Sequence, residues 1–122
     1  MSIADQLGTY AAGWTNGDAA MILSVASDSF FFDDPNQGKI AKADFAAYMA
    51  GLKETVAGIR GGDYDGNFMD LSEVVTSEES GVLTAWCWWA IPGTDIRGSG
   101  LIKVGNDGVA SETITYYAKT AA

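Results

Sequence analysis

The sequence predicts an α+β domain in which N-terminal helices pack on one face of a bent, mainly antiparallel sheet. In the first half of the chain, apolar side chains recur at the three- and four-residue spacing of amphipathic helices. From Phe68 onward, alternating segments separated by close turns indicate consecutive antiparallel strands. Helices that precede strands, instead of alternating with them, favour an α+β arrangement. The 122 residues have the length of one domain, which we assign to 1–122.

Three helices and one strand are expected in the first half. Residues 3–15 form an amphipathic pattern, and Asp18 is placed to cap a second, short helix after the break "TNGD". The run "SFFFDD" is rich in strand-forming residues and ends at Pro35, which cannot donate a hydrogen bond to a sheet. After the turn "PNQGK", apolar residues spaced over 45–59 predict a third and longer helix.

Four strands joined by tight turns are expected in the second half. They correspond to the segments "FMDLSEVVTSEE", "VLTAWCWWAI", "TDIRGSGLIKV" and "VASETITYYA". The turn signals "SG", "PG" and "NDG" separate them. Turns at such close intervals predict an antiparallel meander.

Composition limits the partners that this chain can have. Sixteen acidic against seven basic residues give a net charge of −9, which disfavours binding to nucleic acid or to anionic membranes. No apolar segment is long enough to cross a bilayer, and the N-terminus lacks the basic and apolar regions of a signal peptide. The single cysteine, Cys87, allows no internal disulfide, which is typical of a reducing compartment. We therefore expect a soluble, cytoplasmic protein without nucleic-acid or membrane partners.

The chain contains no histidine, so acid–base chemistry must use Asp, Glu, Tyr, Lys or Cys87. The segment "DYDGN" at residues 63–67 begins like a calcium-binding loop. However, Phe68 and Val74 occupy the positions at which such a loop needs glycine and glutamate. We therefore expect an acidic loop here, with no metal site, and no cofactor elsewhere in the chain.

The strand "VLTAWCWWAI" is apolar on both of its faces. The two faces carry Val82, Trp86 and Trp88 on one side and Leu83, Cys87, Trp89 and Ile91 on the other. An antiparallel sheet with one face in water should instead alternate apolar with polar residues. Because the second face must also be covered, we expect a homodimer formed through the sheet.

Two motifs and the order of the elements carry a resemblance to a known family. The motif "YAAGWTNGD" spans residues 10–18, and "FFFDDPNQG" spans residues 30–38. With a helix, a short helix, a strand, a long helix and then four strands, the chain resembles the nuclear transport factor two-like superfamily. Within it, the chain resembles the ketosteroid isomerase and SnoaL-like polyketide cyclase branch. The resemblance covers nearly the whole chain and implies a cone with an internal cavity.

The resemblance also implies a catalytic pair. In ketosteroid isomerases the Asp before a proline at the end of the first strand is the base, and it matches Asp34. The helix tyrosine that donates a hydrogen bond to the substrate oxygen matches Tyr10. Strand alternation puts Phe30, Phe32 and Asp34 on one face, toward a pocket. Two alternatives stay open: Asp34 can belong to a surface turn, and Tyr10 can fill the core with its hydroxyl paired to Asp34.

One part of the implied site is missing. Ketosteroid isomerases add a protonated acid to the oxyanion hole, but the matching inward position falls at or beside Gly100, in "RGSGLI", where no acid stands. By the same resemblance, the walls of the cavity are mainly apolar with a few hydroxyl groups. The expected lining residues are Trp14, Phe30, Phe32, Tyr48, Met49, Leu52, Trp86, Trp88, Thr113, Thr115 and Tyr117.

Two classes of function fit these observations. The first is an enzyme that isomerises, cyclises or dehydrates a small carbonyl compound, with Asp34 as base and Tyr10 as donor. The second is a non-catalytic ligand-binding or accessory domain of the same fold. Either would bind a small hydrophobic molecule, and the fold alone does not choose between them.

Overall fold

The structure is a computed structural model that describes residues 1–117. Residues 118–122, which belong to the predicted domain and include the end of its predicted last strand, lie outside the described residues. The described elements are α1 (Ile3–Asn16), α2 (Ala19–Ser24), β1 (Ala26–Asp34), β2 (Gly38–Ala41), a 3-10 turn (Lys42–Asp44), α3 (Phe45–Arg60), β3 (Asp70–Glu79), β4 (Val82–Ala90), β5 (Arg97–Gly105) and β6 (Gly108–Tyr116).

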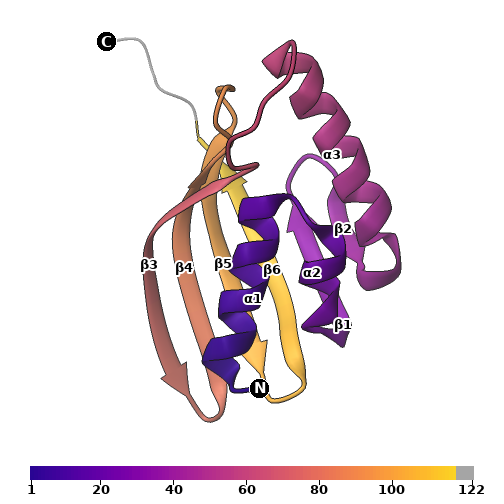
Figure 1. Cartoon of the computed structure of the whole chain (residues 1–122). Helices are drawn as coiled ribbons and strands as arrows, with labels where there is room; N and C mark the ends of the chain where they lie inside the picture. The colour runs from indigo at the N-terminus through magenta and orange to yellow at the C-terminus, as the bar shows by residue number, and fades with distance from the viewer. Residues whose placement is uncertain (118–122) are drawn as a thin grey trace.

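The strands form one open, mixed sheet (Figure 1). Its six strands follow the order β2-β1-β6-β5-β4-β3. Neighbouring strands are antiparallel except β1 and β6, which run parallel. The sheet bends around α1, which lies across its face, while α3 lies beside β2 (Figure 1). The predicted α+β class, with helices on a bent and mainly antiparallel sheet, is confirmed.

Local signals explain where the first helices begin and end. Ser2 and Asp5 cap α1 reciprocally, and the Ser2 hydroxyl accepts the Asp5 N–H at 3.0 Å. Gly17 ends α1 in the left-handed conformation, with a φ of 63°. Asp18 then accepts the Met21 N–H at 3.0 Å and caps α2, as predicted. This short turn keeps α1 and α2 on the same side of the sheet (Figure 1).

β1 ends in a hairpin that the sequence did not reveal. β2 pairs antiparallel with the second half of β1, where Asp34 lies opposite Gly38. We predicted only a turn here, because the short segment "GKIA" is poor in strand-forming residues. Along β1 itself, Phe30, Phe32 and Asp34 are all buried on the inner face, as the predicted alternation requires.

An aromatic cluster joins α1, β1 and α3. Phe45, the first residue of α3, is fully buried at its centre. Its ring centroid lies 5.6 Å from that of Phe30, 5.8 Å from that of Trp14 and 5.9 Å from that of Phe32. All three ring pairs meet edge to face, which is a favoured aromatic geometry. The cluster thereby ties the two longest helices to the strand that carries Asp34.

The side chains of β4 alternate between the interior and the outer face of the sheet. Leu83, Cys87 and Trp89 point inward and are buried, while Trp86 is half-buried and Trp88 is 38% exposed. The prediction that Trp86 and Trp88 line the cavity is therefore wrong. Because successive side chains of a strand point to opposite faces, the tryptophan of this strand that reaches the interior is Trp89.

A bulge in β6 reverses the alternation of its side chains. Lys103 of β5 pairs with Ser111, but the next residue, Val104, pairs with Val109, so Ala110 is an extra residue in β6. Residues on either side of the bulge therefore no longer follow one period-two pattern.

This bulge overturns one set of predicted cavity residues. Val109 and Glu112 are both buried although three positions separate them, and Ile114 continues the inner face beyond Glu112. The residues that we expected inside are exposed instead: Thr113, Thr115 and Tyr117.

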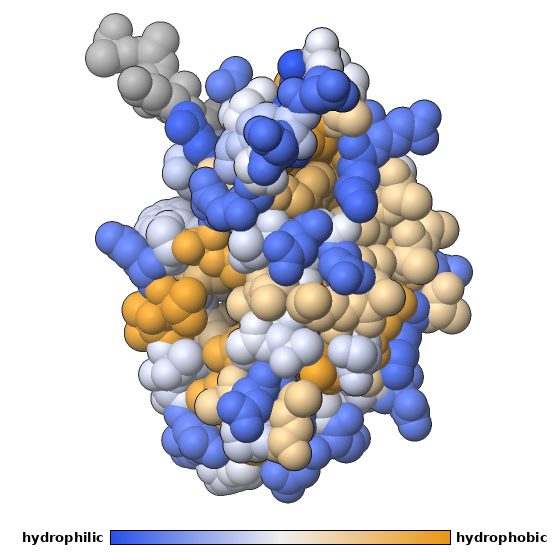
Figure 2. Space-filling model, in the orientation of Figure 1, coloured by the Kyte–Doolittle hydropathy of each residue, from blue (hydrophilic) through white to orange (hydrophobic). Residues whose placement is uncertain are grey.

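Figure 2 shows the side of the molecule that α1 covers. Hydrophilic residues gather at the top of this view and along its rim, while hydrophobic residues occupy its middle, over α1, and its left edge. No helix in residues 1–117 has the length and apolarity needed to span a membrane.

Candidate functional site

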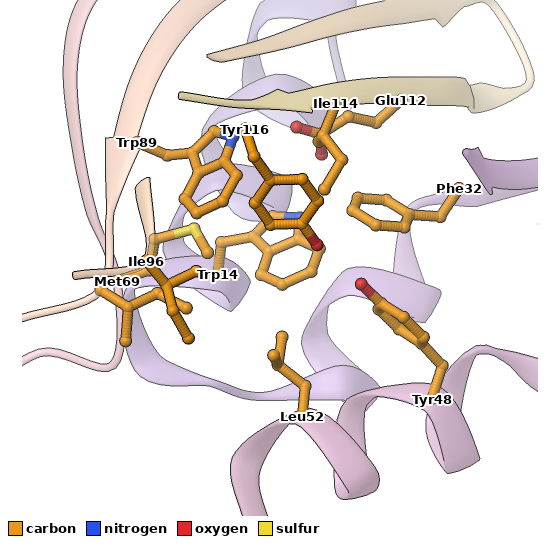
Figure 3. A pocket seen from close by; sticks show the side chains of 11 residues that line it. Trp14, Phe32, Tyr48, Leu52, Met69, Trp89, Ile96, Glu112, Ile114 and Tyr116 are labelled. Carbon is orange, nitrogen blue, oxygen red and sulfur yellow. The ribbon is translucent and has the colours of Figure 1, made fainter. Parts of the chain in front are cut away.

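A narrow apolar cavity lies between the helices and the inner face of the sheet (Figure 3). Its volume is about 20 Å³. That is room for about one water molecule. The polar groups in its walls are one carboxyl, two phenol hydroxyls and two indole N–H groups. The lining residues are Trp14, Phe32, Tyr48, Leu52, Met69, Trp89, Ile91, Ile96, Glu112, Ile114 and Tyr116.

Asp34 lies at the end of β1 and is 2% exposed. The hydroxyls of Tyr48 and Tyr116 both donate hydrogen bonds to its Oδ2, at 2.7 Å and 2.8 Å. Its Oδ1 accepts the backbone N–H of Asn36 at 2.9 Å, which closes an Asp turn around Pro35. The two alternatives for this residue are thus combined, because Asp34 both faces inward and organises the turn.

The Asp34 cluster separates the cavity from a groove on the surface. Asp34 does not line the cavity itself. It lines the groove outside, together with Asn36 and Gln37. Tyr48, Tyr116 and the neighbouring Leu52 line both spaces, and the two hydroxyls point toward each other at the mouth of the cavity (Figure 3). Asp34 therefore contacts the cavity only indirectly, through the hydroxyl groups of Tyr48 and Tyr116 that are hydrogen-bonded to it.

Both tyrosines at the mouth are held in the protonated form. Burial, followed by the hydrogen bond to Asp34 and its negative charge, raises the pKa of Tyr48 far above the ordinary phenol value. The same causes in the same order raise the pKa of Tyr116. Both side chains therefore serve as hydrogen-bond donors over the whole physiological pH range.

Glu112 is the carboxyl group that lines the cavity. It lies on the inner face of β6, is 5% exposed, and accepts a hydrogen bond at Oε1 from the hydroxyl of Tyr10. Burial raises the pKa of Glu112 to about 7, against the lowering effect of Tyr10 and of the nearby Trp14 indole. At neutral pH this carboxyl can both give and take a proton.

Gly100 leaves the space that Glu112 occupies. A Cβ atom built on Gly100 would overlap the Glu112 Oε2 atom. The resemblance requires an acid at this inward position of β5. The position holds Gly100 instead, and it faces Glu112, an acid on the neighbouring strand β6. The interior does contain a second carboxyl group, and it comes from β6 instead of β5.

Tyr10 is paired with Glu112, not with Asp34 as one of our alternatives proposed. It is fully buried in α1, and it is not among the residues that line the cavity. Burial, and then the charge of Glu112, raises the pKa of Tyr10 well above 10. Tyr10 and Asp34, which the resemblance joined as one catalytic pair, therefore belong to two separate carboxyl–tyrosine clusters.

Four of the other predicted lining residues do lie in the cavity wall: Trp14, Phe32, Tyr48 and Leu52. Phe30 and Met49 are buried in the core but do not contribute to the wall. Sequence reasoning missed Glu112, although one signal was available. In the alternative inward set of β6, Ile114 and Tyr116 accompany Glu112, and they are more apolar than the two threonines that we placed inside.

The Cys87 thiol is a poor candidate for the chemistry of this site. Burial, and then the charge of Glu112, raises the pKa of Cys87 to about 11, which makes its thiol a poor nucleophile. Residues 1–117 contain no group of three or more His, Cys, Asp or Glu side chains suited to a metal ion.

Comparison with known proteins finds likeness in structure. No protein-family model matches the chain, and no curated protein matches it. A candidate polyketide cyclase from Xanthomonas campestris aligns over 94% of this chain and 90% of its own, at 14% identity and a TM-score of 0.64. A nuclear transport factor two-like protein from Anabaena variabilis aligns over 96% and 88%, at 12% identity and a TM-score of 0.66. A candidate ketosteroid isomerase from Kribbella flavida aligns over 98% and 81%, at 10% identity and a TM-score of 0.60.

The chain has the nuclear transport factor two-like fold. This confirms the fold that the two sequence motifs implied, including its cavity between helices and sheet. At identities of 10 to 14%, the likeness extends to the fold alone. The chemistry has to be argued from the residues in the cavity.

Proposed function

We propose that this protein binds a small, mainly apolar carbonyl compound in its cavity and transfers a proton on it. The observation that carries the proposal is the position of Glu112, a buried carboxyl in an otherwise apolar wall. Its pKa of about 7 suits a group that must take and return a proton near neutral pH.

The reaction needs no cofactor. The Glu112 carboxylate takes a proton from the carbon next to the carbonyl, and the C–H electron pair forms an enolate with its charge on oxygen. The protonated Glu112 then returns the proton to the same carbon or to another carbon of the conjugated system, which isomerises the compound. Tyr10 holds Glu112 in place by its hydrogen bond and acts as a positioning residue.

Asp34 acts in this proposal through the two tyrosines. Its carboxylate orients the hydroxyls of Tyr48 and Tyr116 at the mouth of the cavity, at 2.7 Å and 2.8 Å. Because the cavity holds about one water molecule, these tyrosines and Leu52 must move apart to admit a ring. Our sequence-based prediction that Asp34 is the base stays a prediction, and the experiment below tests it.

Structural neighbours support the class of reaction. The Xanthomonas protein is a candidate polyketide cyclase and the Kribbella protein is a candidate ketosteroid isomerase. Both reaction classes remove a proton next to a carbonyl group. The fold is compatible with this chemistry, and Glu112 is the residue that provides it here.

The experiment is hydrogen–deuterium exchange on a simple ketone. We expect the protein in D2O to accelerate deuterium incorporation at C2 of 1-indanone, followed by NMR. The variant Glu112→Gln should lose this acceleration and Asp34→Asn should retain most of it. Loss in Asp34→Asn with full activity in Glu112→Gln would identify Asp34 as the base instead.

The second candidate function is a non-catalytic binding domain of the same fold. The lining supports it, because a mainly apolar wall with few polar groups suits binding of a small apolar molecule without any reaction. Binding of ketones without exchange in the wild type would support this alternative over an enzyme.

We also propose that the protein forms a homodimer through the outer face of the sheet. Trp88 and Leu101 are 38% and 40% exposed on that face. The outward-facing side chains of β4, β5 and β6 include no acid, although the whole chain carries a net charge of −9. Two copies can therefore meet there without repulsion between carboxylates. Light scattering after gel filtration should give a dimer that Trp88→Glu dissociates, and a monomeric wild type would contradict the proposal.

A further inference from the structure

Two buried indole N–H groups in the cavity wall lack an acceptor. Trp14 and Trp89 are 3% and 4% exposed, and neither Nε1 atom has a hydrogen-bond partner among residues 1–117. Two other buried side-chain atoms in that range are also unpaired, Gln6 Oε1 and Arg97 Nε, and neither residue lines the cavity. Buried polar groups are nearly always paired. Two unpaired donors in one apolar cavity therefore indicate an acceptor from outside the chain.

The Trp14 donor lies toward Glu112, and the Trp89 donor lies beside Tyr116 (Figure 3). In Figure 3 the Trp14 nitrogen is on the edge of its ring nearest Glu112, and the Trp89 nitrogen is on the side of its ring next to Tyr116. The Trp14 N–H is close enough to the Glu112 carboxyl to lower its pKa, although the indole nitrogen has no hydrogen-bond partner within residues 1–117. The Trp89 ring meets the Tyr116 ring edge-on at 5.5 Å.

We infer that Trp14 and Trp89 donate hydrogen bonds to an oxygen of the bound molecule and thereby select a flat carbonyl compound over the hydrocarbon of the same shape. The inference rests on the proposed function and specifies its ligand. A carbonyl or enolate oxygen accepts from both indoles, whereas a hydrocarbon leaves both unpaired in a dry site. The rings of Phe32 and Tyr116 provide apolar surface for a flat molecule.

A water molecule can occupy this position when no ligand is bound. The cavity volume of about 20 Å³ accommodates about one water. A ligand oxygen reproduces the hydrogen bonds of that water when it displaces it, but a hydrocarbon does not. The preference for an oxygen atom is therefore measurable as a difference between two ligands with the same carbon skeleton.

The test compares 1-indanone with indane by calorimetric titration of the full chain. In Trp14→Phe and in Trp89→Phe, we expect the ratio of the indane Kd to the indanone Kd to fall about threefold to tenfold. The loss of ring volume cancels in this ratio, because both ligands share one skeleton. Trp86→Phe on the outer side of the sheet is the matched control, and its ratio should equal that of the wild type.

An infrared measurement gives an independent readout. The carbonyl stretch of bound ¹³C-labelled 1-indanone should lie at lower frequency in the wild type than in Trp14→Phe or Trp89→Phe, because donated hydrogen bonds weaken the C=O bond. An unchanged Kd ratio together with an unchanged frequency would overturn the inference, and so would failure of 1-indanone to bind.

The catalytic proposal and this inference fail separately. Glu112→Gln should abolish deuterium exchange, whereas the Kd ratio is tested by the two tryptophan variants. If wild-type protein does not exchange deuterium but the two tryptophan variants lose the oxygen preference, the catalytic proposal fails and the acceptor site stands. If exchange depends on Glu112 but the tryptophan variants keep the wild-type ratio, only the acceptor site is overturned.

Discussion

Asp34 and Glu112 are both buried carboxyl groups that accept hydrogen bonds from tyrosine hydroxyls, yet they are held in different ways. Asp34 accepts three hydrogen bonds, from Tyr48, Tyr116 and the Asn36 backbone, and it lines the outer groove. Glu112 accepts one, from Tyr10, and it lines the cavity. The comparison separates a carboxyl group that organises the mouth from one that is available for chemistry.

The position of each residue along its strand explains the difference. Asp34 ends β1, and the following turn offers a free backbone N–H to its side chain. Glu112 lies in the middle of β6, where neighbouring backbone groups are engaged in the sheet. Its donor must come from a helix packed above, and α1 supplies Tyr10. With one donor from α1, burial dominates and the pKa of Glu112 rises to about 7.

The largest expected effect is on catalysis. Glu112→Gln should reduce deuterium exchange into 1-indanone by about 100-fold or more, because it removes the base. In the wild type the exchange rate should increase as pH rises through about 7, where Glu112 ionises. Asp34→Asn should reduce the exchange rate less than Glu112→Gln does, and it should keep the pH dependence of the wild type. If Asp34→Asn reduces the exchange rate more than Glu112→Gln does, the roles assigned to the two carboxyl groups are reversed.

The second effect is on the pH dependence of stability. The folded protein binds the Glu112 proton more tightly than the unfolded chain does, since its pKa is raised from 4.5 to about 7. The free energy of unfolding should therefore fall by about 3 kcal/mol as pH rises from 4.5 to 7. Urea unfolding of wild type and Glu112→Gln across this range measures the difference. Parallel curves for the two proteins would show that Glu112 ionises normally.

A third effect distinguishes neighbouring acids on the two faces of β1. Asp34→Ala should lower the free energy of unfolding by about 2–3 kcal/mol, because it leaves two tyrosine hydroxyls and a backbone N–H without their acceptor. Asp33→Ala is the matched control, since Asp33 points to the other face, and it should cost less than about 0.5 kcal/mol. Equal losses would mean that the hydrogen bonds of Asp34 do not contribute to stability.

The smallest effects concern the two hydroxyls at the mouth. Tyr48→Phe and Tyr116→Phe should each cost about 1 kcal/mol of unfolding free energy, with the larger loss at Tyr48. Tyr116 is 36% exposed, and water can replace part of its interaction. Tyr117→Phe, on the exposed side, is the control and should change stability very little. A larger loss at Tyr117 than at Tyr48 would contradict this account of the mouth.

The sequence predicted the parts of this site that depend on neighbouring residues. Alternation along β1 placed Phe30, Phe32 and Asp34 on one buried face, and the structure confirms it. The family resemblance implied that Trp14 and Leu52 line the cavity, and both lie in its wall. Glu112 was not found, because the resemblance placed Thr113, Thr115 and Tyr117 inside and so assigned Glu112 to the opposite face of β6.

What the sequence by itself determined is the order of the helices and of every strand except β2, the caps of the first helices and the inner face of β1, all of which follow from residues a few positions apart. Only the tertiary structure decided which tyrosine donates a hydrogen bond to which carboxyl group. Tyr10 meets Glu112 across 102 positions, and Tyr116 meets Asp34 across 82. Hydrogen bonds at such separations depend on how α1 and α3 cross the sheet and on the register of β6, which no local pattern encodes.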